Sequence, residues 1–256
     1  MAISAKIIQQ APVFQAFQAP TYQLAHSVRR CSSLKAVSHG VVRPASVEHA
    51  TEAIEAVRSG GVIAVPTDTL YGFACDACSI EAVNRIYDIK GRKHTSPVAI
   101  CVGDVLDIAR FAVTDHLPEG LLDDLLPGPV TVVLKRGEHS ILEKSLNPGI
   151  DSIGVRVPDN DFIRLICQGF GSALALTSAN LSGQPSSVCI NDFEKLWRHC
   201  KYVYDAGLLP LGNAGSTIVD LTEPGKYKII RTGSAREETV ETLEKYSIRQ
   251  ENVSTS

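Results

Sequence analysis

Hydrogen-bonding side chains are concentrated directly after a strand-like apolar run in the first third of the chain. In "AVPTDTLYGF", the run "GVIAV" (61–65) ends and is followed by Thr67, Asp68, Thr69, Tyr71 and a glycine. Hydroxyl and carboxylate groups at this position can bind a polar ligand, or they can form a turn by bonding to their own backbone. Other strand ends in the sequence help to decide between these two interpretations.

Four further buried strands begin, end or are interrupted in a similar way. The features are "TSANLSG" after "ALAL", Arg156 within "IGVRVP", Ser216 and Thr217 at the start of "STIVDL", and Arg231 at the end of "YKIIR". Ligands of α/β proteins bind where strands terminate. We therefore predict that these strand ends converge on one ligand site.

Two cations follow a predicted helix in "IKGRKHTSP". Lys90 and Arg92 flank Gly91, which would let backbone approach closely, so both cations could face a polyanion. The alternative is a basic helix terminus that complements the helix dipole. A P-loop and a dinucleotide-binding glycine motif are both absent, as are H-E-x-x-H and G-x-S-x-G. The remaining hydroxyl, amide and guanidinium groups suit the binding and orientation of charged reactants.

The fold that must position these groups is predicted from hydrophobic periodicity. Helical patterns occupy 46–61, with Ser46 as a possible cap, and 79–91, with Ser79 as a possible cap. Apolar strands are predicted at 62–66, 97–102, 130–136, 153–158, 173–179, 216–221 and 227–233, and further helices near 104–111, 161–168, 191–199 and 236–246. This order predicts a single α/β domain at 45–246, with a twisted mixed sheet flanked by helices, a concave ligand site at the strand ends and a short tail at 247–256.

Charge is distributed unevenly along the chain. Residues 1–47 contain no Asp or Glu but five of the 25 basic residues, which leaves 20 basic against 28 acidic residues, a net charge of about -8, in the remainder. An acid-free N-terminus without the apolar block of a secretory signal is typical of an organelle transit peptide at 1–44, with a disordered tail as the alternative. A chloroplast is favoured over a mitochondrion, and a cytosolic form stays open. No run reaches the ~20 apolar residues that span a bilayer, which argues against a membrane protein.

The seven cysteines are odd in number and scattered, so most are predicted to be small buried side chains. "CDAC" at 75–78 has the spacing of a redox pair or half of a zinc site. No second pair follows at zinc-like spacing, and no metal ligands are therefore predicted.

Seven ordered blocks together resemble the threonylcarbamoyl-AMP synthase family, the YrdC-like domain, between about 45 and 246. They are "PTDTLYGFACDA", "KGRKHTSPVAI", "LLPGPVTVVLKR", "IGVRVP", "LALTSANLSGQPSS", "GSTIVDL" and "IIRTG". The length is similar to that of the short, single-domain eukaryotic form. The resemblance implies that L-threonine, bicarbonate and ATP are joined into threonylcarbamoyl-adenylate, with Mg²⁺ accompanying ATP and pyrophosphate released. A transferase complex would then modify the adenosine next to the anticodon of tRNAs.

The resemblance also implies roles for individual residues. Threonine would be held by Thr69, Arg156, Ser178 and Ser216. ATP would be surrounded by Lys90, Arg92, Ser96, Ser152, Asn180 and Arg231, with Lys90 and Arg92 stabilising the transition state. Gly72 would permit a turn, and Tyr71 would form a pocket wall.

Four positions depart from the family pattern. Cys101 stands where the long forms often have a threonine-contacting histidine, and Lys93 stands where they have a proline. Val188 replaces an ATP-side threonine, and Thr232 replaces the proline of the usual "RPG". A thiol cannot reproduce the hydrogen bonds of an imidazole. Two other functions stay open at this point: a carbamoyl-adenylating enzyme of the same fold, and a double-stranded RNA- or tRNA-binding module. The negative net charge of the main body disfavours the RNA-binding alternative.

Overall fold

The computed structural model describes residues 41–91, 97–138, 140–210 and 214–251. Almost all of the predicted tail at 1–44, and the residues Arg92 and Ser96 of the predicted ATP site, lie outside these ranges. Within them, no helix is long and apolar enough to cross a membrane.

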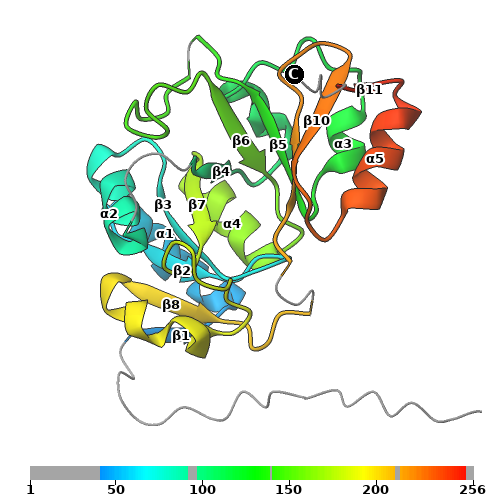
Figure 1. The fold of residues 1–256 in the computed structure, drawn as a ribbon. Helices are drawn as coiled ribbons and strands as arrows, with labels where there is room; N and C mark the ends of the chain where they lie inside the picture. Colours follow the sequence, from blue (N-terminus) through cyan, green and yellow to red (C-terminus); the bar gives the residue numbers. More distant parts are fainter. Residues whose placement is uncertain (1–40, 92–96, 139, 211–213, 252–256) are drawn as a thin grey trace, which may run out of the picture. The chain divides into compact units, whose positions relative to one another are not determined.

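The described residues form an 11-stranded mixed sheet with helices against it (Figure 1). The strands are β1 (Val42–Pro44), β2 (Ile63–Val65), β3 (Gly72–Asp76), β4 (Ala99–Cys101), β5 (Val130–Lys135), β6 (Ser152–Arg156), β7 (Leu174–Ser178), β8 (Tyr202–Asp205), β9 (Thr217–Asp220), β10 (Lys226–Arg231) and β11 (Arg249–Gln250). Their order across the sheet is β1-β8-β2-β3-β7-β4-β6-β5-β9-β10-β11. The predicted single-domain α/β fold with a mixed sheet is confirmed.

The helices differ in type and length. The α-helices are α1 (Ala50–Arg58), α2 (Ile80–Lys90), α3 (Leu121–Leu125), α4 (Asp161–Phe170) and α5 (Arg236–Lys245), and the 3₁₀ helices are η1 (Val47–His49), η2 (Val105–Arg110) and η3 (Ile190–His199). Ser79 caps α2 as predicted, because its hydroxyl accepts a hydrogen bond from the Ala82 N–H. Ser46 does not cap α1; its hydroxyl contacts His49 Nδ1 instead, and the segment starts as a 3₁₀ turn. The predicted helix 46–61 is therefore shorter than expected.

The two faces of the sheet pack against different helices. One face carries α1 and α4, which bury a cluster containing Val65, Phe162 and Leu174. The opposite face carries α2, η3, α3 and α5 over a larger cluster that includes Ile153 and Val155 of β6. Since side chains alternate along a strand, Ser152, Gly154 and Arg156 project toward the face of α1 and α4.

Short strands account for most of the differences from the predicted fold. Strands β1, β8 and β11 have at most four residues and were not predicted, because such short segments show no clear periodicity. As a result, the sheet begins at Val42 and reaches Gln250, slightly beyond both predicted domain limits. Strand β3 was also missed, since its residues 72–75 are buried on both faces and show no alternation of polar and apolar side chains.

Gly72 and Gly91 are required for reasons other than those predicted. Gly72 does not have a positive φ; a Cβ at this position would lie 2.7 Å from Leu176 Cδ1, so glycine allows β3 to approach β7 closely. Gly91 has φ 60° and ends α2 in the left-handed conformation. Close approach of the backbone, which was predicted for Gly91, is thus the role of Gly72, and the turn predicted for Gly72 is found at Gly91.

Candidate active site

A cavity of about 400 Å³ lies where several strands of the sheet begin or end. Polar side chains from five separate segments line it, namely Thr69 from the β2–β3 loop, Arg156 from β6, Ser178 from β7, Ser216 before β9 and Arg231 from β10. These are the strand ends that the sequence singled out. The prediction that they gather at one place is confirmed, and the four predicted threonine-binding residues are among them.

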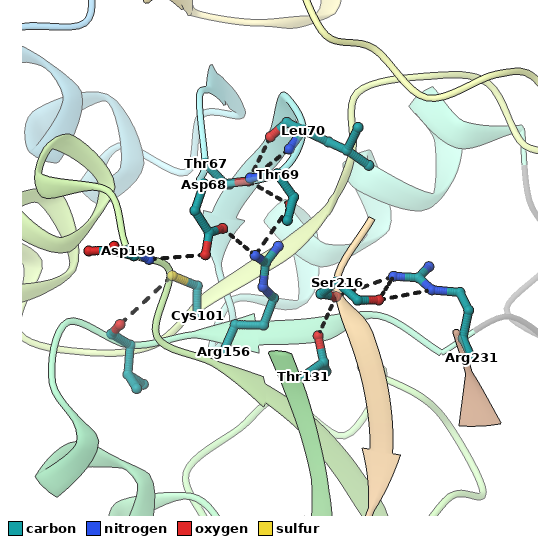
Figure 2. A network of polar contacts seen from close by, with 11 residues as sticks. Thr67, Asp68, Thr69, Leu70, Cys101, Thr131, Arg156, Asp159, Ser216 and Arg231 are labelled. Atoms are coloured by element: carbon teal, nitrogen blue, oxygen red, sulfur yellow. Dashed lines mark hydrogen bonds and ion pairs between the residues drawn. The ribbon is translucent and has the colours of Figure 1, made fainter. Parts of the chain in front are cut away.

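The β2–β3 loop is organised around one hydroxyl group. Thr67 Oγ1 accepts hydrogen bonds from the N–H groups of Thr69 and Leu70, both at 3.1 Å, and donates to Leu70 O at 2.7 Å. The Thr69 hydroxyl lies 3.1 Å from Thr67 Oγ1. This turn fixes the position of Asp68 and Thr69, whose side chains both reach Arg156 (Figure 2).

Arg156 is paired with Asp68, a partner that the sequence analysis missed. Its Nη2 donates to Asp68 Oδ1 at 2.5 Å and to Thr69 Oγ1 at 3.3 Å, and the two charged side chains are only 9% and 7% exposed. The backbone N–H of Asp159 donates to the other carboxylate oxygen of Asp68. Arg156 Nε is buried and has no hydrogen-bond partner among the described residues.

Lys90 is buried rather than exposed. Its side chain is almost inaccessible, and Nζ donates to Ser178 O at 2.6 Å, to Ser178 Oγ at 3.2 Å and to Asn180 Oδ1 at 2.8 Å. Asn180 in turn donates from Nδ2 to Gln184 O. The expectation of a solvent-exposed cation at the helix end is wrong for Lys90, because its ammonium group holds the segment after β7.

Ser216 and Arg231 form a second polar group on the opposite side of the cavity. The Ser216 hydroxyl lies 2.7 Å from Thr131 Oγ1, and Arg231 Nη2 donates to Ser216 O at 2.9 Å (Figure 2). Desolvation of the guanidinium, followed by the nearby charge of Arg156, lowers the pKa of Arg231. No carboxylate is among the described residues that line this cavity. Two guanidinium groups without a lining carboxylate favour an anionic ligand.

Tyr71 lines the cavity, in agreement with the predicted wall, but its hydroxyl is engaged elsewhere. Tyr71 Oη donates to Gly207 O at 2.8 Å and accepts from the Ala206 N–H at 2.8 Å. Burial raises the pKa of the phenol well above its ordinary value. The ring is therefore a structural wall that ties the β2–β3 loop to the segment after β8.

The predicted ATP residues are only partly brought together. Arg231 lines the cavity, whereas Asn180 is buried beside Lys90. Ser152 begins β6 on the same sheet face as Arg156 but is not among the residues that line the cavity. Arg92 and Ser96 lie outside the described residues. Thr131 was not predicted, although a hydroxyl within the otherwise apolar run "VTVVL" is the signal that could have identified it.

None of the cysteines that the structure describes lines the cavity. Cys101 is fully buried next to Arg156 in the β4–β6 register, and its Sγ lies 3.6 Å from Cys167 Sγ of α4. The contact with Cys101, together with burial, raises the pKa of Cys167. Cys75 and Cys78 have different partners, Asp76 O and Ser172 Oγ, and burial raises the pKa of both thiols. Four of the six described cysteines, Cys75, Cys101, Cys167 and Cys200, are buried, which agrees with the prediction that most are small buried side chains.

The sequence and the structure are similar to those of known proteins. The sequence matches the family Sua5_yciO_yrdC, described as "Telomere recombination", over residues 55–233. It is 46% identical to the threonylcarbamoyl-AMP synthase of Bos taurus over 84% of this chain and 81% of that protein, and 46% identical to that of Homo sapiens over 84% and 80%. The crystal structure of P. abyssi Sua5 complexed with L-threonine is similar with a TM-score of 0.72 and 27% identity, covering 84% of this chain and 64% of that chain.

Proposed function

The chain belongs to the threonylcarbamoyl-AMP synthase (YrdC/Sua5) family and makes threonylcarbamoyl-AMP for tRNA modification, and on that premise we propose how its residues divide the substrates. The observation that carries the proposal is the convergence of Arg156, Arg231 and several hydroxyl groups on one cavity. Threonine occupies the end of the cavity near Thr69 and Ser178, and its carboxylate binds Arg156. A guanidinium is the group best suited to a planar carboxylate.

ATP occupies the Arg231 side of the cavity and extends along β6 toward Ser152. Arg92 and Ser96 complete the phosphate contacts in this proposal. Lys90 contributes from a buried position and does not line the cavity. Its ammonium group orients Ser178 and Asn180 and adds positive charge close to the reacting groups. Mg²⁺ neutralises phosphate charge when it is bound. In this proposal the ion would be bound through the phosphates of ATP.

The reaction needs positioning more than proton transfer. The amine of threonine adds to bicarbonate with loss of water, or to CO2 with loss of a proton, and forms a carbamate. An oxygen of the carbamate then attacks the α-phosphate of ATP, the bond from the α-phosphate to the β-phosphate oxygen breaks, and pyrophosphate leaves. Negative charge accumulates in each step, and Arg156, Arg231 and Lys90 stabilise it electrostatically. The hydroxyl groups of Thr69, Ser178 and Ser216 hold the amino acid in line for the attack. A transferase complex that modifies tRNA then receives the product.

Threonine should trigger the release of pyrophosphate from ATP when bicarbonate is present. The measurement is a coupled pyrophosphate assay with the purified protein, supported by chromatographic detection of the adenylate product. Serine in place of threonine serves as the control, and omission of bicarbonate as a second one. Equal release with serine, or release with carbamoyl phosphate and no amino acid, would contradict the proposed substrates.

We also propose that the N-terminal region directs the chain to an organelle, with a chloroplast favoured over a mitochondrion. Its support is composition alone: residues 1–47 carry five cations and no acid. A fluorescent protein fused after residues 1–45 should accumulate in plastids or mitochondria. The matched control replaces Arg29 and Arg30 with glutamate, which should abolish import. A diffuse cytosolic signal from the unaltered fusion would contradict the proposal.

A further inference from the structure

Asp68 occupies an unusual position between two segments of the site. It lies in the β2–β3 loop, whereas Arg156 ends β6, and the sheet order brings these distant segments together. Both oxygens of its carboxylate are engaged: Oδ1 accepts from Arg156 Nη2, and Oδ2 accepts from the Asp159 N–H at 3.1 Å. The carboxylate itself is not part of the cavity lining. Asp68 therefore acts on the site through Arg156 rather than on a ligand directly.

The nitrogen atoms of the Arg156 guanidinium differ in their hydrogen bonding. Nη2 is occupied by both Asp68 and Thr69, whereas Nε is buried without a partner among the described residues. A buried polar group of this kind is rare unless a ligand or water completes it. Asp68 thus keeps Nη2 bound to protein, and the other donors of the guanidinium remain available to a ligand.

We propose that Asp68 is a positioning residue for amino-acid recognition, which holds the guanidinium of Arg156 so that its remaining donors grip the carboxylate of threonine. This inference rests on the proposed function, because it assumes that Arg156 binds that carboxylate. The ion pair also keeps Arg156 in place before substrate arrives, since an unpaired guanidinium would otherwise be costly to bury. Recognition then depends on directed hydrogen bonds from a preorganised group rather than on net charge.

A purely structural role for Asp68 is the competing explanation. In that case Asp68 would only join the β2–β3 loop to the segment after β6 through the Asp159 N–H. The two roles differ in what a substitution changes. Loss of a positioning residue raises the KM for threonine selectively, whereas loss of a structural link changes the KM values of both substrates together.

The substitution Asp68→Asn tests the proposal in the full-length protein. It keeps the size of the side chain and one oxygen acceptor but removes the charge that holds Arg156. The apparent KM for threonine is expected to rise roughly tenfold with the KM for ATP nearly unchanged, while the melting temperature falls because the buried guanidinium loses its charged partner. Asp159→Asn is the matched control, because it removes an equal charge from an exposed neighbour whose contact with Asp68 is made by its backbone N–H and not by its side chain, and it should behave like the wild type.

A double-variant cycle separates action through Arg156 from independent effects. If Asp68 works by orienting Arg156, adding Asp68→Asn to Arg156→Lys should raise the threonine KM little beyond Arg156→Lys alone. L-threonine amide provides a second readout, since it lacks the carboxylate. The preference of the enzyme for threonine over the amide should narrow in Asp68→Asn to the same extent as in Arg156→Lys.

Three results would overturn the proposal. They are additive effects in the double variant, an unchanged threonine KM in Asp68→Asn, and an equal rise of both substrates' KM values. Should Asp68→Asn fail to fold, Asp68→Glu keeps the charge but displaces it by one methylene group, and the same selective loss of threonine affinity is expected. A wild-type protein without threonine dependence would instead refute the proposed function, so the two failures are distinguishable.

Discussion

Lys90→Ala is expected to abolish product formation and, in addition, to destabilise the fold. The side chain is 1% exposed, and its ammonium group donates to Ser178 and Asn180. Truncation leaves a cavity and unpaired buried acceptors, which together cost roughly 3–5 kcal/mol. Activity should fall by about 100-fold or more, because Ser178 and Asn180 lose the group that orients them. Urea unfolding and the pyrophosphate assay measure the two effects.

Two control variants distinguish the contributions of packing and charge. Lys90→Met restores most of the volume without the ammonium group, so it should recover part of the stability but little of the activity. Lys195→Ala removes an exposed lysine of η3 and should change neither property. Near-normal turnover of Lys90→Ala at saturating ATP would show that Lys90 does not serve the reaction.

The burial of Lys90 could have been predicted from the sequence, where its place near Gly91 suggested instead a cation that faces a polyanion. Along α2 the buried positions include Val83, Ile86, Tyr87 and Lys90, which share one helical face at spacings of three and four residues. A lysine on the apolar face of a helix needs partners in the interior. Its position in the pattern therefore indicates a buried, hydrogen-bonded cation more strongly than its place near Gly91 indicates an exposed one.

The convergence of the cavity residues could be predicted, whereas their pairing could not. Ser178, Ser216 and Arg231 each stand next to an apolar strand, so their common location follows from the rule that strand ends meet at the edge of a sheet. The ion pair of Arg156 depends instead on the order of strands. Its partner, Asp68, is 88 residues away in the sequence, so no local pattern around Arg156 points to it.

Unknown strand order also limited the prediction of the fold, because it left strand β3 unrecognised. β3 pairs antiparallel with both β2 and β7, an arrangement that needs Gly72 against Leu176. The sequence "GFACD" carries no alternation of polar and apolar residues, because both of its faces are buried. Its assignment as a strand depends on neighbours that are distant in the chain, and a propensity-based prediction has no access to them.

Arg156→Lys is expected to impair threonine recognition while the fold survives. The new ammonium group can still form an ion pair with the buried carboxylate of Asp68, so the cost of leaving that charge unpaired is avoided. A lysine cannot, however, hold Asp68 and Thr69 and also present a planar pair of donors to a second carboxylate. The substitution therefore separates the structural role of Arg156 from its proposed role in binding.

The apparent KM for threonine should rise about tenfold or more in Arg156→Lys, a loss of about 1.4 kcal/mol or more, with the KM for ATP almost unchanged. Arg231→Lys is the matched control, because Arg231 lines the other side of the cavity and should mainly raise the KM for ATP. Each substrate is titrated at saturating concentrations of the others, and the melting temperature is recorded for both variants. If Arg156→Lys changed only the ATP requirement, or lost its cooperative unfolding transition, the carboxylate of threonine could not be the ligand of Arg156. A rise confined to threonine in Arg156→Lys and to ATP in Arg231→Lys would mean that the two guanidinium groups divide one cavity between an amino acid and a nucleotide.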